Sequence, residues 1–323
     1  LEQLCVEKVY AEPWCVGDAQ QHRLAQRTVM LRHSRRFGSE SGIGQLARAV
    51  NQSEAQQAWQ LLHSDAPDIQ YLLLKQNNSA ALNQLLLNVS AHHSGALNSA
   101  GYAYYLQVLQ QQRPAADKPF ADPSWQQWAA LVLQAFDQFR LLCALRKGEF
   151  GVAGLNERIA TALQQQGLIS SAQGWYEGRP VLVTQNDYSL GLMNGDIGIA
   201  LLLPNADASA ENGEPQQVLR VVFARNDAQG GVRYILPSRL TAVETVFAMT
   251  VHKSQGSEFV HTALILPDRL NPVLTKELLY TGITRAKNKF TLIEGHSGIF
   301  TAAVQRKVER VSGLNQAICA VGG

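Results

Sequence analysis

The stretch Val246–Leu266 reads VFAMTVHKSQGSEFVHTALIL and joins two apolar runs through a polar connection. Short apolar runs bounded by polar residues are typical of strands that are buried on both faces of a parallel sheet. The connection carries His, Lys, Ser, Gln, Gly and Glu, more polar groups than a turn between two strands requires. The stretch therefore predicts an α/β fold with a functional loop between two core strands.

The sequence on either side of this stretch extends the same sheet. The run FTLIEG at Phe290–Gly295 predicts a further strand, and the segment from about Pro272 to Ala286 predicts a helix before it. A short strand near Met30 is expected to join the sheet, as is Leu141–Ala144 if that segment is not helical. The predicted core is therefore a parallel sheet with helices between its strands.

Residues 175–243 have a different pattern. The runs RPVLVTQND, GDIGIALLLP, QQVLRVVFA and GVRYILPSRL alternate with turn-forming segments, which predicts a small antiparallel β-barrel of the SH3-like type inserted before the last core strands. Asn186, Asn194 and Asp196 are interpreted as turn formers within it. The predicted domains are residues 1–174, residues 175–243 and residues 244–323.

The first domain is expected to carry helical additions. Residues 51–98 are rich in Gln, Ala and Leu and predict helices, and a proline-containing loop follows at residues 112–124. The apolar residues from Trp125 to Gly148 cover most faces of a helix, which predicts one buried helix with Trp125 and Trp128 in the core.

Composition excludes several classes of protein. A net charge of +2 over 323 residues is too small to indicate a nucleic-acid binder by electrostatics alone. The four cysteines lack metal-ligand spacing, so we expect buried free thiols and no metal site. No apolar run reaches the roughly 18 residues that span a bilayer. We expect a cytoplasmic protein without a membrane partner.

Three polar clusters are candidates for chemistry: SRRFGSESG from Ser34, TVHKSQGSEF from Thr250 and YTGITRA from Tyr280. Ligands of open α/β sheets bind beyond the carboxyl ends of the strands, so we expect the second and third clusters to meet there. By residue type alone, His252 is better explained as a core histidine bonded to a backbone carbonyl. Lys253 is a solvated or DNA-facing charge.

Six segments in order resemble the RecD family of superfamily-one DNA helicases, including its motifs IV, V and VI. They are RFGSESGIGQLA, LLCALRKGEFGVAGLNERI, WYEGRPVLVTQND, GLMNGDIGIAL, AMTVHKSQGSEF and ELLYTGITRA. The landmarks run from about Met30 to Leu314, so the resemblance covers nearly the whole chain. It implies the second, RecA-like motor domain of a helicase.

The resemblance also implies roles for particular residues. Arginine fingers stabilise the charge that develops in phosphoryl transfer, and the family motifs place two of them in this chain. The implied sets are the catalytic fingers Arg36 and Arg285, the nucleotide-binding residues Arg35, Gln255, Gly256 and Glu258, and the DNA-binding residues Thr250, His252, Ser254 and Asn156. Arg35 stands where relatives often have an aromatic residue that stacks on adenine.

Some of these roles have a structural alternative. Asn156 is as well explained as a residue that caps or bridges a turn, and Trp175 and Tyr176 are weaker candidates for base stacking. The sequence contains neither GxxxxGK[ST] nor an acidic Walker B pair. The resemblance therefore implies that ATP and Mg²⁺ are held mainly by an N-terminal motor domain outside this chain, and that the chain alone is inactive.

The family implies a 5′-to-3′ helicase subunit of exodeoxyribonuclease V in double-strand-break repair and recombination. The implied partners are single-stranded DNA and the beta and gamma chains of that complex. The alternative is a non-enzymatic module that binds DNA or a partner chain. Arg36 and Arg285 favour the helicase, because a binding module has no use for arginine fingers.

Overall fold

The computed structural model describes residues 37–38, 40–74, 79–87, 101–205, 216–225 and 230–308. Residues 1–40 and 41–323 form two separate units, and the elements below all belong to the second. The strand predicted near Met30 lies outside the described residues, as do Arg35 and Arg36. In the described part of the chain, no helix has the length and apolarity that a membrane span requires.

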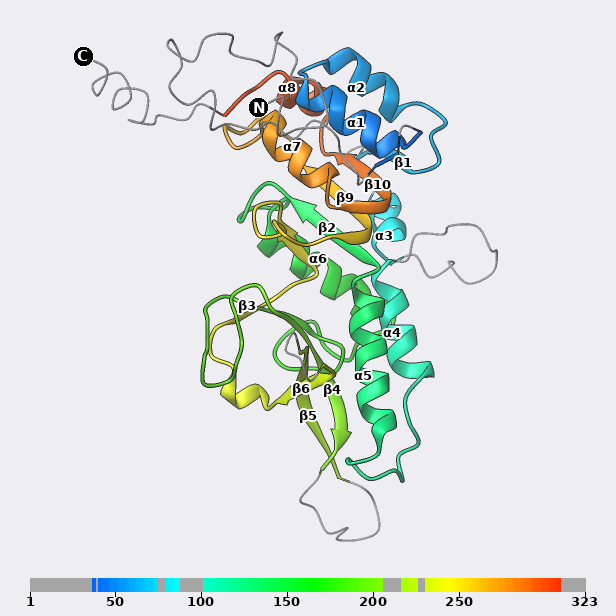
Figure 1. The fold of residues 1–323 in the computed structure, drawn as a ribbon, viewed down its shortest axis with the longest axis vertical. Coiled ribbons are helices and arrows are strands. Elements are labelled where there is room, and N and C mark those ends of the chain that lie inside the picture. The colour runs from blue at the N-terminus through cyan, green and yellow to red at the C-terminus, as the bar shows by residue number, and fades with distance from the viewer. Residues whose placement is uncertain are drawn as a thin grey trace, which may run out of the picture. The chain divides into compact units, whose positions relative to one another are not determined.

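A five-stranded parallel sheet organises this unit (Figure 1), which confirms the predicted α/β class. The strand order is β1-β10-β9-β2-β8, and every neighbouring pair is parallel. The central strand β9 is buried along nearly its whole length. The strands are β1 (Ile69–Leu73), β2 (Phe139–Cys143), β8 (Ala248–Thr250), β9 (Phe259–Leu266) and β10 (Ala286–Glu294).

Helices cover this sheet in two groups. Helices α1, α2, α7 and α8 contact one another, whereas α3 contacts α4 and α6, and α4 packs on α5. Figure 1 shows α7 on one side of the sheet and α6 on the other. The helices are α1 (Gly42–Asn51), α2 (Ala55–Leu62), α3 (Ser79–Leu87), α4 (Tyr102–Gln111), α5 (Pro123–Phe136), α6 (Val152–Gln165), α7 (Lys276–Ile283) and α8 (Ile299–Val304).

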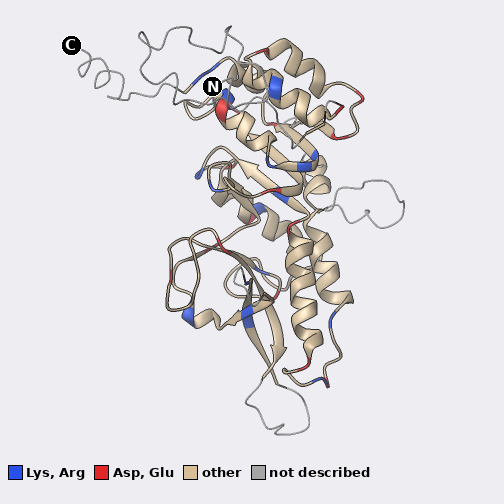
Figure 2. Cartoon of the chain, viewed as in Figure 1, with Lys and Arg blue, Asp and Glu red and all other residues tan. Residues whose placement is uncertain are grey.

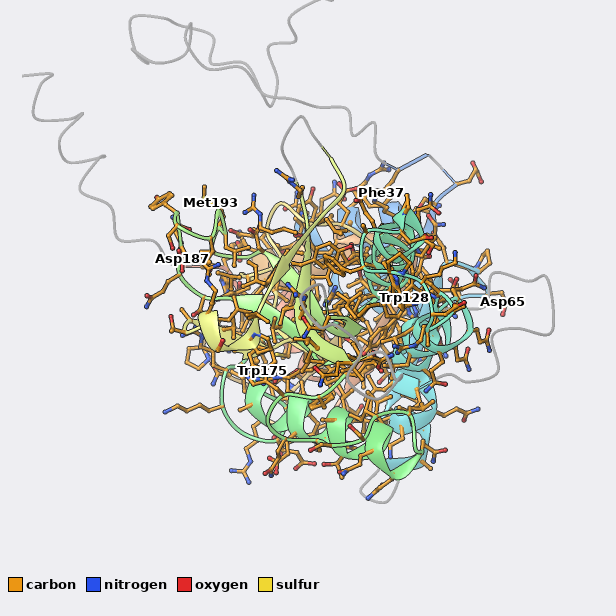
Figure 3. All side chains as sticks on the ribbon, turned by 90° about the horizontal axis from the view of Figure 1, so that it is seen from below. Phe37, Asp65, Trp128, Trp175, Asp187 and Met193 are labelled. Atoms are coloured by element: carbon orange, nitrogen blue, oxygen red, sulfur yellow. The ribbon has the colours of Figure 1, made fainter. Side chains whose placement is uncertain are left out.

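Two predictions for the helical region were wrong. Strand β1 interrupts residues 51–98, and the helix predicted up to Gly148 ends at Phe136 and is followed by β2. The alternative that Leu141–Ala144 belongs to a strand of the same sheet is confirmed. Strand β2 lies between β8 and β9 and is buried at all five positions. Because it is buried on both faces, its residues are mostly apolar, and the sequence could therefore be mistaken for a buried helix. The core positions of Trp125 and Trp128 are confirmed, because both side chains are almost completely buried; Figure 3 labels Trp128 among the surrounding side chains.

A second sheet lies between α6 and β8 in the chain, as predicted for the insertion. It is antiparallel, with the order β6-β5-β4-β3-β7. We find no pairing of its outer strands β6 and β7 within the described ranges, so a closed SH3-like barrel stays a prediction. The strands are β3 (Pro180–Val183), β4 (Ile197–Pro204), β5 (Gln217–Ala224), β6 (Val232–Ile235) and β7 (Val243–Thr245), and a 3-10 turn, η2, occupies Pro237–Arg239.

The polar residues predicted to form turns in this insertion do so. The Asn186 carboxamide oxygen accepts the backbone N–H of Asn194 at 2.8 Å, and the Asp196 carboxylate accepts that of Met193 at 2.8 Å. Asp187 and Met193 mark this turn at the periphery of the view in Figure 3. These side chains replace backbone partners in the turn, which is the usual role of Asn and Asp there.

Candidate nucleotide and DNA site

The polar loop Val251–Glu258 connects the two sides of the parallel sheet at which its strands end and begin. We call the side with the carboxyl ends of the strands the carboxyl edge, and the side with their amino ends the amino edge. Thr250, which ends β8, is level with Cys143 and through it with Ile265 near the carboxyl end of β9. The loop then leads to Phe259, the first residue of β9. It therefore travels back along β9 by about 20 Å, the length of six strand residues. One short loop has its first residues at the carboxyl edge and its last residues at the amino edge.

At the beginning of the loop, the buried side chains of Thr250 and Ser254 hydrogen-bond to the loop backbone, and the His252 side chain is exposed. The Ser254 side chain is fully buried, and its hydroxyl donates to the Val251 carbonyl at 2.8 Å. The Thr250 hydroxyl is nearly buried and accepts the Lys253 N–H at 3.3 Å. His252 is exposed, so its interpretation as a core histidine was wrong. Of the expected DNA-binding residues in the loop, His252 alone presents a largely exposed side chain.

Burial gives Ser254 a different role from the expected contact with DNA. Its amide donates to the Thr250 carbonyl at 3.2 Å, and its hydroxyl bonds within the same turn. A side chain without exposed surface cannot reach a phosphate in this conformation. Ser254 therefore shapes the turn that presents His252.

The end of the loop brings the expected nucleotide-binding residues close to Arg285. The Arg285 guanidinium donates to the Ser257 carbonyl at 3.0 Å and to the Thr281 carbonyl at 3.1 Å. Glu258 lies 3.8 Å from the ammonium group of Lys287. Gly256 has φ +87°, and a Cβ built there would meet no atom within 4 Å. A left-handed residue with an open side gives an approaching ligand direct access to the backbone.

The expected position of Arg285 was wrong. It was predicted to lie at the carboxyl edge, but α7 returns from the end of β9 to the start of the parallel strand β10, so its last turn lies at the amino edge. The Phe259 N–H donates to the Arg285 carbonyl at 2.9 Å, which fixes the two segments together. The last residues of the loop and Arg285 therefore form one group at the amino edge.

A cavity of about 810 Å³ lies between the loop and α7. It is bordered by the polar side chains of His252, Gln255, Thr281, Glu277, Arg306 and Lys307. Gln255 lies in the middle of the loop, so the cavity includes one residue from each expected ligand set. Figure 2 shows Lys and Arg spread over many elements of the described chain.

Asn156 neither caps nor bridges a turn, but joins helix α6 to strand β8. Its side chain is nearly buried, its carboxamide oxygen accepts the Ala248 N–H at 2.9 Å, and its NH₂ group donates to the Ala248 carbonyl at 3.3 Å. Both polar groups of one strand residue are thereby satisfied by one side chain. Asn156 bridges α6 to β8 and presents little surface to a ligand.

The remaining candidates lie apart from the loop or have partners. Lys253 lies 3.8 Å from a carboxylate oxygen of Glu244. Tyr176 is buried, which removes it as a stacking surface, whereas Trp175 is 36% exposed and has the Arg179 guanidinium 4.6 Å from its ring centre. Nowhere in the described ranges do three or more His, Cys, Asp or Glu side chains gather as a metal site would require.

Sequence reasoning missed two residues that support this site. Arg140, in β2, is fully buried, and Tyr102, in α4, is 1% exposed. The signal for Arg140 was present, because an arginine in the apolar run FRLLC needs buried partners. Nothing in the sequence around Tyr102 distinguishes it from an ordinary core aromatic residue.

The loop, α7 and most of β10 coincide with a known helicase domain. Residues 245–293 match the model of the UvrD-like helicase C-terminal domain. The chain is also 34% identical to the RecBCD enzyme subunit RecD of Haemophilus influenzae, over 88% of this chain and 40% of that protein. The expected resemblance to the RecD family is thus confirmed, and the chain is a relative of part of these subunits.

Two further similarities are more distant. The ATP-dependent RecD2 DNA helicase of Deinococcus radiodurans is 28% identical, over 55% of this chain and 23% of that protein. The crystal structure of Bacteroides Pif1 bound to single-stranded DNA overlaps 67% of this chain and 50% of its own, with 15% identity and a TM-score of 0.31. That TM-score is too low to define the fold. The chain spans about two fifths of the length of the Haemophilus relative.

Proposed function

We propose that the chain is the second, RecA-like motor domain of an ATP-dependent DNA helicase subunit of the RecD type. In the whole protein it moves 5′ to 3′ on single-stranded DNA, together with the beta and gamma chains of exodeoxyribonuclease V, in double-strand-break repair and recombination. The observation that carries this proposal is the path of the loop Val251–Glu258. A loop that begins at one edge of the sheet and ends beside an arginine at the other can link two ligands.

The amino edge is the proposed nucleotide side. Arg285 and Lys287 supply positive charge there, and Gly256 leaves the backbone open. ATP, the substrate, would be held between this edge and a P-loop domain, with Gln255 and Glu258 as polar contacts and Arg35 and Arg36 as further cations. Arg285 would stabilise charge on the transferred phosphoryl group.

Magnesium does not fit the described residues of this chain. The carboxylate of Glu258 is near Lys287, and the described residues provide no cluster of ligands for a metal ion. Our proposal therefore gives Mg²⁺ to another part of the whole protein and assigns no step to it here.

The carboxyl edge and the adjoining cavity are the proposed DNA side. His252 is exposed, and Arg306 and Lys307 add positive charge to the cavity wall. Imidazole and hydroxyl groups bond phosphate oxygens without reading the base sequence. A DNA strand that contacts His252 would displace the turn that contains Ser254. The displacement would extend along the loop to Ser257, whose carbonyl accepts a hydrogen bond from Arg285.

The test uses the full-length protein, in which Arg285→Ala should reduce kcat for DNA-stimulated ATP hydrolysis on the order of a thousandfold. Nucleotide affinity should change much less, because the contact acts mainly in the transition state. Single-turnover hydrolysis and nucleotide titration measure the two effects. Arg239→Ala is the control, since that side chain is exposed and lies in η2, within the inserted antiparallel sheet and outside both proposed sides of the site.

Two results would contradict the proposal. One is a full-length protein that binds DNA but hydrolyses no ATP, as a non-enzymatic module would. The other is an Arg285→Ala variant that melts early while its folded fraction hydrolyses ATP at the normal rate. The isolated chain should show no ATPase activity, which a turnover assay with and without single-stranded DNA checks.

A further inference from the structure

Three buried side chains from three separate elements bind one short piece of backbone, Val246–Ala248. This piece is where the chain leaves the antiparallel sheet at β7 and enters the parallel sheet at β8. The side chains are those of Tyr102 in α4, Arg140 in β2 and Asn156 in α6. Buried polar side chains are usually hydrogen-bonded, and here three of them bond consecutive backbone residues.

Tyr102 and Asn156 hold the middle and the end of this piece. The Tyr102 hydroxyl donates to the Phe247 carbonyl and accepts the Leu141 N–H at 3.0 Å, so one oxygen atom links the residue before β8 to β2. Asn156 satisfies both the N–H and the carbonyl of Ala248. The start of β8 is thus fixed from two helices and from the neighbouring strand.

Arg140 contacts the chain on both sides of the functional loop. Its guanidinium donates to the Val246 carbonyl at 3.2 Å, before the loop, and lies 4.9 Å from the ring centre of Phe259, directly after it. The guanidinium is also 4.1 Å from the Phe136 ring centre and bonds Asp137 at 3.2 Å. One buried group therefore contacts the chain before β8 and again directly after the loop Val251–Glu258.

Strand β8 needs such support. It has three residues, it lies at the edge of the sheet, and it pairs with β2 alone. Short edge strands fray because few ladder hydrogen bonds hold them. A buried hydrogen bond contributes about 1 kcal/mol, and a carbonyl left without its donor costs about 1–3 kcal/mol, so the side-chain bonds are comparable with the strand's own pairing.

We propose that Tyr102, Arg140 and Asn156 are positioning residues that fix β8 and so set the path of the loop Val251–Glu258 between the two edges of the sheet. They touch neither nucleotide nor DNA. Their consequence for catalysis rests on the proposed function: a loosely held β8 would take up the displacement caused by DNA at His252 before it reached Ser257 and Arg285. Their effect on the loop itself does not depend on that function.

The chain offers a matched pair of variants. Tyr102 and Tyr105 both lie in α4, both are 1% exposed, and each hydroxyl donates to a backbone carbonyl. The Tyr105 hydroxyl donates to the Gly178 carbonyl at 2.8 Å, just before β3 and outside β8. Tyr102→Phe and Tyr105→Phe therefore each remove one buried hydroxyl, but Tyr102→Phe alone releases the start of β8.

The first measurement is amide hydrogen exchange in the chain itself. Tyr102→Phe should speed exchange of the Val251 and Ser254 amides, which donate to the Cys143 and Thr250 carbonyls, by about five- to tenfold. Tyr105→Phe should leave these rates within about twofold of the parent chain, although it too removes a buried hydroxyl. Equal effects of the two variants on the loop, or none, would overturn the proposal.

The second measurement uses the full-length protein. Tyr102→Phe should lower the stimulation of ATP hydrolysis by single-stranded DNA by about five- to tenfold, whereas Tyr105→Phe should retain it. Faster exchange with unchanged stimulation would overturn the coupling role. A parent protein that lacks DNA-stimulated hydrolysis would instead refute the proposed function, and the exchange result on the isolated chain would still decide whether these residues position the loop.

Discussion

The parallel and antiparallel sheets are stabilised in different ways. All ten buried polar or charged side chains found in the described residues belong to the parallel sheet, its loop or its helices α6 and α7. The core cluster of the antiparallel sheet is apolar, and the charged residues in its strands, Arg220, Arg233 and Glu244, are partly buried or exposed. The ten are Arg140, Asn156, Thr250, Ser254, His261, Thr262, Thr275, Thr284, Thr291 and Glu294.

This difference indicates that the side chains of the parallel sheet are held in a more defined arrangement than those of the antiparallel sheet. Apolar burial is non-directional, so an apolar core stabilises a fold without fixing atoms to a particular angle. Hydrogen bonds are directional, and a buried polar group has to be satisfied in one arrangement. The parallel sheet carries the loop and Arg285, and we infer that its buried polar groups serve their placement more than the overall free energy of unfolding.

The largest expected effect tests whether the two sheets respond separately. Phe223→Ala in β5 and Phe290→Ala in β10 each remove a fully buried ring, and each should destabilise the chain by about 3–5 kcal/mol. Below the melting transition, Phe223→Ala should speed amide exchange mainly in β3–β6, and Phe290→Ala in β9, β10 and the loop. Uniform acceleration in both variants would show that the sheets open as one unit.

Sequence patterns predicted the parallel sheet well where apolar runs end at polar loops. Strands β8, β9 and β10 and helix α7 were recognised in this way. Strand β1 was missed because IQYLL lies within a Gln- and Leu-rich region that was interpreted as continuous helix, although Pro67 precedes the strand and Asn77 and Asn78 follow it. Strand β2 was assigned to a helix because only Asp137 and Gln138 separate it from α5, and both segments are apolar on most faces.

The site was predicted less completely than the strands. The residues of the loop and Arg285 could be recognised from their order in the sequence, but the edge of the sheet at which Arg285 lies could not. That position depends on α7 returning along the sheet. The burial of Ser254 and the attachment of Asn156 to Ala248 are likewise tertiary features, because each depends on a backbone group whose position only the folded chain defines.

An effect of intermediate size on the free energy of unfolding is expected when the pH is lowered, and it should arise from His261 in the parallel sheet. His261 is 1% exposed and bonds the Thr291 hydroxyl at 2.8 Å; burial, with a smaller effect of Lys289, lowers its pKa from 6.5 to about 3. Below pH 6.5 the unfolded chain therefore binds a proton that the folded chain does not. The stabilisation from neutral His261 is fully present above pH 6.5 and is lost as pH falls toward 3.

The loss attributable to His261 should reach about 2 kcal/mol between pH 6.5 and pH 5. Denaturant titrations at several pH values measure it. In His261→Gln, which cannot titrate, the free energy of unfolding should fall less steeply across this range than in the parent chain. Identical slopes would mean that His261 takes up its proton in the folded state, and that this buried polar group is less rigidly held than the comparison of the two sheets requires.

The smallest expected effect on stability distinguishes two kinds of residue in the loop: the exposed His252, which is available to a ligand, and the buried Ser254, which stabilises the turn. His252 is exposed, so His252→Ala should change the free energy of unfolding by less than about 0.5 kcal/mol. Ser254 is fully buried and bonds the Val251 carbonyl, so Ser254→Ala should cost about 1 kcal/mol or more. Chemical denaturation of the isolated chain measures both values.

In the full-length protein, His252→Ala should weaken DNA binding more than Ser254→Ala does, which is the reverse of their order for stability. His252 is the proposed phosphate contact, whereas Ser254 only shapes the turn. His252→Ala should raise the DNA concentration that gives half-maximal stimulation of hydrolysis and leave unstimulated hydrolysis largely intact. Ser254→Ala should shift that concentration less. A His252→Ala variant that melts early and binds DNA normally would return this histidine to a structural role and remove the DNA side of the site. The nucleotide side, which depends on Arg285, would remain to be judged by its own test.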